Sequence, residues 1–205
     1  MSVPSSSADH AGDVDVVFVC TGNRARSPLA AAVLCRRVHG LPVRVSSRGT
    51  MELGPAAPLR EMMIAAQGLG IDLSEHRAGR LADGELARAD LVVGFEPFHV
   101  AAAVVEGGAR PEVAFTLAEL ESLVVPGDQA SESPSLPVRV AEVVRRADAR
   151  RAGGSRLSAP AIEDPFGAGQ RVFDRLAAEI EGLVDNVAAA LFGAVGNDLR
   201  QAGVR

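Results

Sequence analysis

Apolar and polar positions follow two different periods along this chain. Short apolar runs predict buried strands, because a strand in a parallel sheet is covered on both faces. We expect strands at residues 14–19, 41–47, 91–95 and 111–115. Longer segments with apolar positions three and four residues apart predict helices at residues 28–38, 58–69, 97–105, 117–123, 138–151 and 170–192, with a short helix inside the polar segment 71–89.

Strands and helices therefore alternate along the sequence. This order is typical of an α/β fold, and it predicts a single domain with a four-stranded, mostly parallel sheet and helices on both faces. We expect disordered tails at residues 1–12 and 193–205. Ligands of such sheets bind at the carboxyl ends of strands, and the first predicted strand ends at Cys20.

Composition excludes several classes of function. The formal net charge of −5 argues against a general nucleic-acid binder. Two cysteines are too few for a disulfide framework and fit a reducing compartment, so we expect a cytoplasmic protein. We expect no signal peptide and no insertion into a membrane, because the N-terminus has no basic start and no stretch is long and apolar enough. The oligomeric state stays open.

The loop between the first strand and the first helix carries the candidate chemistry. It begins at Cys20, ends at Arg26 and contains Thr21, Gly22, Asn23, Arg24 and Ala25. No proline interrupts it, so its amides are free to point inward as an anion-binding nest. Gly22 permits a positive φ, and Asn23 tolerates one better than most residues. The positive end of the helix and the planar Arg26 guanidinium would then hold a tetrahedral dianion.

A sulfur nucleophile and an acid complete this hypothesis. Helix N-termini and nearby cations favour the ionised form of a thiol, and the Ser27 hydroxyl could donate a hydrogen bond to Cys20. Asp164 precedes a proline, which holds its loop stiff, and a carboxyl near a phosphate dianion retains its proton more readily. Asp164 is therefore the candidate acid for a leaving group. An inert buried Cys20 and an ordinary turn at Asp164 are the alternatives.

Residues 20–28 resemble the signature loop of low-molecular-weight protein tyrosine phosphatases. Four further segments resemble the same family in the same order along the chain: residues 47–50, 70–78, 89–93 and 164–167. The family implies a phosphatase domain at residues 13–192, and an insertion at about 126–160 lies outside the usual family length. The insertion contains an Arg-rich helix, which is either a solvated face or a basic rim for acidic phosphopeptides.

The resemblance also implies roles for single residues. Cys20 attacks phosphorus and forms a phosphocysteine, while Arg26 and the amides of residues 21–26 bind the phosphate. Asp164 protonates the leaving phenol and then activates water. Four residues support the loop: Asn23, Ser27, Ser47 and His76. The family implies no metal and no cofactor, because backbone and arginine supply the positive field; its partner is a phosphorylated protein.

The sequence departs from the family pattern around the pocket. Ala25 stands where many members have a second cysteine, so the reversible disulfide of the loop cannot form. Arg24 would repel a guanidinium substrate, which argues against phosphoarginine. Phe166 is a candidate for the aromatic pocket wall, and the chain has no Tyr or Trp to help it.

Three functions stay open on this basis. The leading hypothesis is hydrolysis of phosphotyrosine, or a similar aryl phosphate, through a phosphocysteine. A phosphate- or phosphoprotein-binding module with a silent site is the second, motivated by Arg24 and the thin aromatic wall. Thiol-based arsenate reduction is the third and the weakest, because it needs a resolving cysteine and none follows Cys35.

Overall fold

A computed structural model describes residues 13–125, 135–153 and 161–193. The tails predicted at both ends lie outside the described residues, apart from Gly193, and so do the two ends of the predicted insertion. Four strands form one sheet in the order β2-β1-β3-β4, and all neighbouring strands are parallel. They are β1 (Val14–Cys20), β2 (Val43–Gly49), β3 (Leu91–Gly94) and β4 (Ala114–Thr116). The predicted α/β fold is confirmed.

Within the described residues, six α-helices connect and cover these strands: α1 (Arg26–Arg37), α2 (Arg60–Gly68), α3 (Pro97–Val105), α4 (Leu117–Leu123), α5 (Leu136–Ala152) and α6 (Gln170–Phe192). Among the described residues, no helix has the length and apolar character needed to cross a membrane.

Two local predictions are wrong. The strand expected at residues 111–115 begins only at Ala114, because the 3-10 helix η1 (Pro111–Val113) comes first. Proline has no N–H for a sheet ladder, which explains why the strand does not start at Pro111. The short helix expected within residues 71–89 is absent; these described residues form turns, and Gly84 lies at φ 71°.

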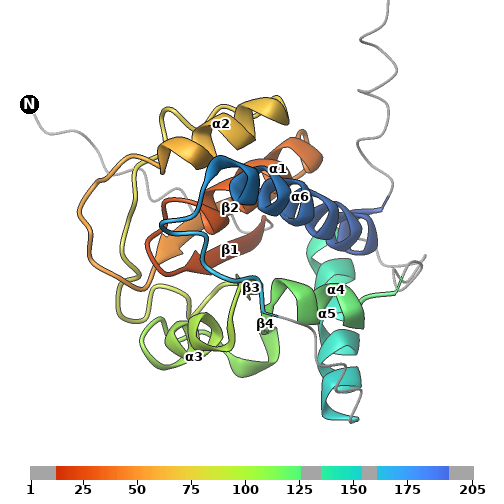
Figure 1. The fold of residues 1–205 in the computed structure, drawn as a ribbon. Helices are drawn as coiled ribbons and strands as arrows, with labels where there is room; N and C mark the ends of the chain where they lie inside the picture. Colours follow the sequence, from red (N-terminus) through yellow and green to blue (C-terminus); the bar gives the residue numbers. More distant parts are fainter. Residues whose placement is uncertain (1–12, 126–134, 154–160, 194–205) are drawn as a thin grey trace, which may run out of the picture.

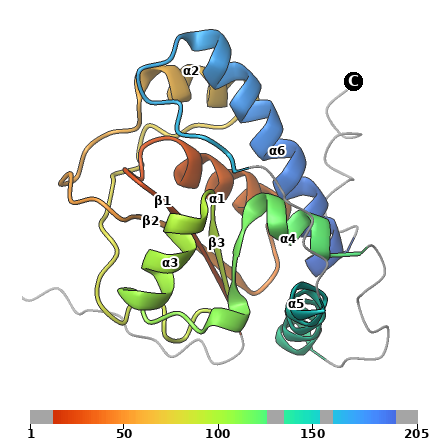
Figure 2. The ribbon, with the colours of Figure 1, turned by 60° about the horizontal axis from the view of Figure 1, so that its bottom comes forward.

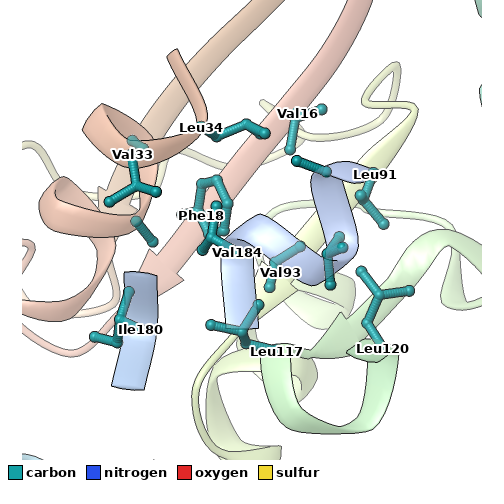
Figure 3. Packing of buried hydrophobic residues seen from close by; sticks show 14 of the residues in the cluster. Val16, Phe18, Val33, Leu34, Leu91, Val93, Leu117, Leu120, Ile180 and Val184 are labelled. Carbon is teal, nitrogen blue, oxygen red and sulfur yellow. The ribbon is translucent and has the colours of Figure 1, made fainter. Parts of the chain in front are cut away.

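The central strand separates two apolar layers. Val16 and Phe18 point toward α1 and α6, whereas Val17 and Val19 pack on the opposite face, where α3 lies. Figure 1 shows α1 and α6 in front of the sheet, and Figure 3 shows Phe18 between side chains of these two helices. Each buried Val, Leu or Phe contributes about 1.5–3 kcal/mol. The strand that ends at Cys20 is therefore held from both sides.

The Arg-rich helix of the predicted insertion is α5, and it lies away from the Cys20 end of the sheet. It packs against α4, α6 and η1, as Figure 2 also shows for the helices. Because η1 immediately precedes β4, α5 lies near the end of the sheet where β4 begins, which is opposite to the Cys20 end. Arg151 donates to Ala114 O at 2.8 Å and lies over the Phe115 ring, while Arg145 pairs with Glu142. The helix therefore forms no basic rim at the Cys20 loop.

Candidate active site

The loop after β1 is a ring of unpaired backbone amides. β1 ends at Cys20, and α1 begins at Arg26. No amide of residues 21–25 donates a hydrogen bond to another atom in the part of the chain that the structure describes. Because unpaired amides are costly when they are removed from water, such a ring favours an anion. Sequence analysis named Gly22 and Asn23 as residues that accept a positive φ, and of these two Asn23 adopts one, with φ 51°.

Asn23 is the hub that holds this backbone. Its side chain is 1% exposed, and its amide nitrogen donates to Ser27 Oγ at 2.9 Å and to Ser47 Oγ at 2.8 Å. The amide oxygen accepts from Gly79 N at 3.0 Å. Both amide protons and one lone pair of the amide oxygen are thus used inside the protein. The left-handed conformation at Asn23 is fixed by these contacts.

His76 approaches the same residue from outside the loop. Its Nε2 lies 2.8 Å from Asn23 O. Burial lowers the pKa of His76, although the hydrogen bond to Asn23 acts in the opposite direction. A neutral ring with its proton on Nε2 donates to Asn23 O. The structure therefore brings Ser27, Ser47 and His76 together around Asn23.

The Cys20 sulfur lies beside a hydroxyl, at the end of the buried strand β1. Cys20 is 2% exposed, and its Sγ is 3.0 Å from Ser27 Oγ. Ser27 Oγ accepts a proton from Asn23, and its own proton has two possible acceptors, the Cys20 sulfur at 3.0 Å and Arg48 O at 3.4 Å. The shorter contact favours the sulfur. A thiolate at Cys20 would be stabilised by this donor and by the positive N-terminus of α1.

Arg26 is a buried cation held by two carboxylates. It is 1% exposed, and its Nη1 donates to Glu96 and to Ile162 O. Its Nη2 donates to Asp164 Oδ2 at 2.6 Å and to Thr21 Oγ1 at 3.2 Å. A buried charge is tolerated only when it is paired and hydrogen-bonded, and Arg26 meets this condition. Its guanidinium plane is consequently fixed at the edge of the loop.

Asp164 reaches the site from a segment far along the chain. Ile162 N donates to Phe95 O at 3.0 Å, which ties this segment to the end of β3. The second oxygen of Asp164 accepts from Phe166 N at 3.0 Å, so a local turn orients the carboxyl toward Arg26. The side chain stays 40% exposed. Sequence reasoning placed Cys20, Arg26 and Asp164 in one site, and the structure brings them together.

A cavity of about 370 Å³ opens above the loop, and Cys20, Arg26 and Asp164 all line it. Sequence analysis expected Arg24 and Phe166 in its wall, and both line it. The Arg24 side chain is tied by Nε to Ala57 O at 2.7 Å. Sequence analysis missed three further apolar wall residues: Met51, Leu53 and Leu59. They follow β2 without any periodic pattern, so no signal pointed to them.

Gly49 also escaped sequence analysis, and it allows β2 to approach the loop. A Cβ at this position would lie 2.9 Å from Thr21 O and 3.1 Å from Asn23 N. Both are backbone atoms of the amide ring, so they cannot move aside without distorting it. Gly49 belongs to the segment 47–50, which resembles the family. Only glycine fits there, because the backbones of β2 and the loop come so close together.

We predict that Gly49→Ala destabilises the loop. The free energy of unfolding should fall by about 1–3 kcal/mol, as is usual for overpacking, and the affinity for inorganic phosphate should fall with it. Urea denaturation and calorimetric phosphate titration measure the two effects. Gly182→Ala in α6 is the control, because a Cβ there meets nothing within 4 Å. Equal behaviour of the two variants would contradict the role of Gly49.

Taken together, the site combines a thiol, an anion nest, a guanidinium and a carboxyl around one cavity. This set can hold a phosphoryl group, attack it with sulfur and protonate a leaving oxygen. In the described parts of the chain, no group of three or more His, Cys, Asp or Glu side chains could hold a metal ion.

Known proteins share parts of this sequence and this fold. A probable low molecular weight protein-tyrosine-phosphatase, EpsP from Ralstonia nicotianae, is 38% identical over 78 residues, which is 38% of this chain and 52% of the relative. The chain thus spans about half the length of the curated relatives it matches. The crystal structure of a low molecular weight protein tyrosine phosphatase from T. tengcongensis has a TM-score of 0.61 and 25% identity, with 85% of this chain and 97% of that chain covered.

A second solved structure shares the fold alone. It is the YwlE arginine phosphatase from Geobacillus stearothermophilus, with a TM-score of 0.62 and 22% identity, and 94% of this chain and 98% of that chain covered. It is named an arginine phosphatase and the T. tengcongensis protein a tyrosine phosphatase, so the fold by itself does not select the phosphorylated group.

Residues 15–121 match the family described as low molecular weight phosphotyrosine protein phosphatase. This range contains the loop and His76 but ends before Asp164, which only the geometry places in the site. The resemblance seen in the sequence is confirmed. Since the match covers more than half of the 205 residues, the chain belongs to the low molecular weight phosphotyrosine protein phosphatase family.

Proposed function

We propose that this protein hydrolyses phosphotyrosine, or a similar aryl phosphate monoester, through a phosphocysteine intermediate. The observation that carries the proposal is the ring of unpaired amides at residues 21–25, which lies between the Cys20 sulfur and the Arg26 guanidinium. Such a ring, with a fixed cation beside it, stabilises the charge of a phosphoryl group without rearrangement.

In the first step the dianion replaces the Asp164 carboxylate on Arg26. The Cys20 sulfur attacks phosphorus, an S–P bond forms, and the bond between phosphorus and the phenolic oxygen breaks. Asp164, carrying a proton, donates it to the departing oxygen, so that a neutral phenol leaves. The two groups act from opposite sides of the phosphorus, in line with the requirements of phosphoryl transfer.

In the second step water replaces the phenol. The Asp164 carboxylate takes a proton from water, the water oxygen bonds to phosphorus, and the S–P bond breaks. Inorganic phosphate leaves, and the Cys20 thiolate is restored. The Ser27 hydroxyl, 3.0 Å from the sulfur, stabilises this thiolate as it departs. The reaction needs no metal and no cofactor, because the amides and Arg26 provide the positive field.

The walls of the cavity favour an aryl group. Met51, Leu53 and Leu59 offer apolar surface, and Phe166, which is 77% exposed, offers an aromatic face at the rim. A phenyl ring gains by leaving water for such a wall. Arg24, held near the wall by Ala57, repels a cationic guanidinium group. The substrate class we propose is a phosphorylated cytoplasmic protein that presents phosphotyrosine.

Arsenate reduction finds little support in the arrangement of the two thiols. Cys35 lines a separate hollow together with Ser47 and His76, behind the Asn23 hub. Partial desolvation raises the pKa of the Cys35 thiol although the residue keeps exposed surface, so that less of it is ionised at neutral pH. The sequence contains no third cysteine to resolve a bond formed at Cys20.

A turnover screen tests the proposal. We expect the purified protein to hydrolyse p-nitrophenyl phosphate and phosphotyrosine peptides, with phosphoserine and phosphoarginine peptides of the same sequence hydrolysed at least about 100-fold more slowly, a discrimination of roughly 3 kcal/mol. The chelator EDTA should leave the rate unchanged. Phosphate binding without any turnover would instead select the silent module, and thiol-coupled turnover of arsenate would select the reductase.

A further inference from the structure

His99 is a buried histidine that the proposed reaction does not use. It lies in the first turn of α3 and is 1% exposed. Its Nδ1 accepts hydrogen bonds from two backbone amides, those of Phe95 at 3.3 Å and Glu96 at 3.1 Å. A ring nitrogen that accepts two protons from the backbone carries none of its own. The geometry thus fixes one side of the imidazole.

The ring is also neutral. Burial, and then the nearby Arg26 charge, lower the pKa of His99 to about 4, although the Glu96 and Asp164 carboxylates act in the opposite direction. A neutral imidazole has one proton, and Nδ1 is excluded as its position. The proton therefore lies on Nε2, which is 3.0 Å from Thr21 Oγ1. His99 is a donor to this hydroxyl.

Thr21 Oγ1 receives a second proton from Arg26. The Arg26 Nη2 atom lies 3.2 Å away on the same guanidinium edge that contacts Asp164. A hydroxyl has two acceptor lone pairs and one donor proton. Because both lone pairs are engaged, the hydroxyl proton of Thr21 is directed away from His99 and Arg26. The described residues provide no acceptor for it, and Thr21 lines the cavity beside Cys20.

We infer that His99 is a positioning residue that holds the Thr21 hydroxyl as an additional hydrogen-bond donor to the bound phosphoryl group. The inference rests on the proposed function and names a donor that it did not include. Thr21 would act through its side chain as well as its amide. The His99 ring connects the start of α3 with the phosphate loop, so that the donor is oriented before the substrate arrives.

Four variants separate this role from a structural one. Thr21→Val removes the hydroxyl at nearly constant shape, and Thr21→Ser restores it. His99→Asn keeps an acceptor for the amides at the start of α3 but is too short to reach Thr21, so the helix start should persist. His39→Asn applies the same substitution to an exposed histidine and is the matched control.

Calorimetric titration with inorganic phosphate gives the main readout. We expect Thr21→Val to weaken phosphate binding by about tenfold, the loss of one hydrogen bond to a charged group. His99→Asn should weaken it by about three- to tenfold, since the hydroxyl is then free to rotate. A double variant that combines Thr21→Val with His99→Asn should bind no more weakly than Thr21→Val alone, because both changes remove the same donor. Thr21→Ser should restore most of the affinity that Thr21→Val loses, and His39→Asn should match the wild type.

Nitrogen-15 NMR of the histidine rings tests the tautomer independently of any activity. We expect His99 to show a proton on Nε2 and no titration between pH 8 and pH 5. A proton on Nδ1, additive losses in the double variant, or full phosphate affinity in Thr21→Val would each overturn the inference. If the protein binds phosphate in this pattern but hydrolyses no aryl phosphate, the proposed function fails while the role of His99 stands.

Discussion

Replacing Cys20 with serine is expected to lower kcat for p-nitrophenyl phosphate by at least about 10⁴-fold. A serine hydroxyl keeps its proton at neutral pH, so it needs a base to become a nucleophile. The two histidines near the loop cannot serve, because His76 and His99 each direct Nε2 to another partner. The amide ring and Arg26 remain in place, so inorganic phosphate should still bind within severalfold of the wild type.

Cys35→Ser is the matched control for this prediction. It makes the same substitution on α1, in a hollow separate from the cavity above the loop, and its kcat should equal that of the wild type. Single-turnover measurements with acid quench should trap a phosphorylated protein in the wild type and none in Cys20→Ser. A Cys20→Ser protein that keeps a hundredth of the activity would show that another group attacks phosphorus.

Local sequence was sufficient for the part of the site that is continuous in the chain. The apolar run that ends at Cys20 and the Ala-rich helix that follows are separated by only five residues. The end of the strand, the loop and the start of the helix are therefore close together in any fold that this segment adopts. The family resemblance then added Ser47 and His76, which the sequence alone would not have connected with Asn23.

The residues that sequence analysis missed reach the site across the fold. Glu96 and His99 lie just after β3, and they meet Arg26 and Thr21 only because β3 pairs beside β1. In the sequence, a histidine at the start of a helix looks the same in two cases. It can donate a hydrogen bond to a residue of the site, or it can be a buried ring whose hydrogen bonds are purely structural. The hydrogen bonds at both ring nitrogens make that distinction, and they exist only in three dimensions.

The Arg-rich helix shows where sequence analysis had to leave two alternatives, a solvated face and a basic rim. Charge along a helix does not reveal which end of the sheet the helix covers. The buried face of α5, including Val140 and Val143, packs on the main core. That apolar face fixes the position of α5 near η1. Its arginines then make local contacts, such as Arg151 with Pro111 O and Arg146 with Glu142. Packing thus overrides the impression given by the exposed charges.

Replacing Asp164 with asparagine is expected to lower kcat for phosphotyrosine by about 10²- to 10³-fold, the usual contribution of a general acid. Asparagine keeps the shape of the side chain but cannot donate a proton as readily as a carboxylic acid. The loss should shrink as the leaving phenol becomes more acidic, because such a phenol needs less help to depart. Steady-state rates across a series of substituted phenyl phosphates measure this dependence.

Asp164 has a second contact that this series can separate from acid catalysis. Its carboxylate also pairs with Arg26, so the variant could act through the guanidinium alone. In that case every phosphate ester would lose the same factor, whatever its leaving group, and the acid role would be wrong. Glu163→Gln, which neutralises the exposed neighbouring carboxylate, is the control for a change of local charge, and it should leave the whole series unchanged. A steeper dependence of kcat on leaving-group acidity in Asp164→Asn alone would assign the proton to this carboxyl.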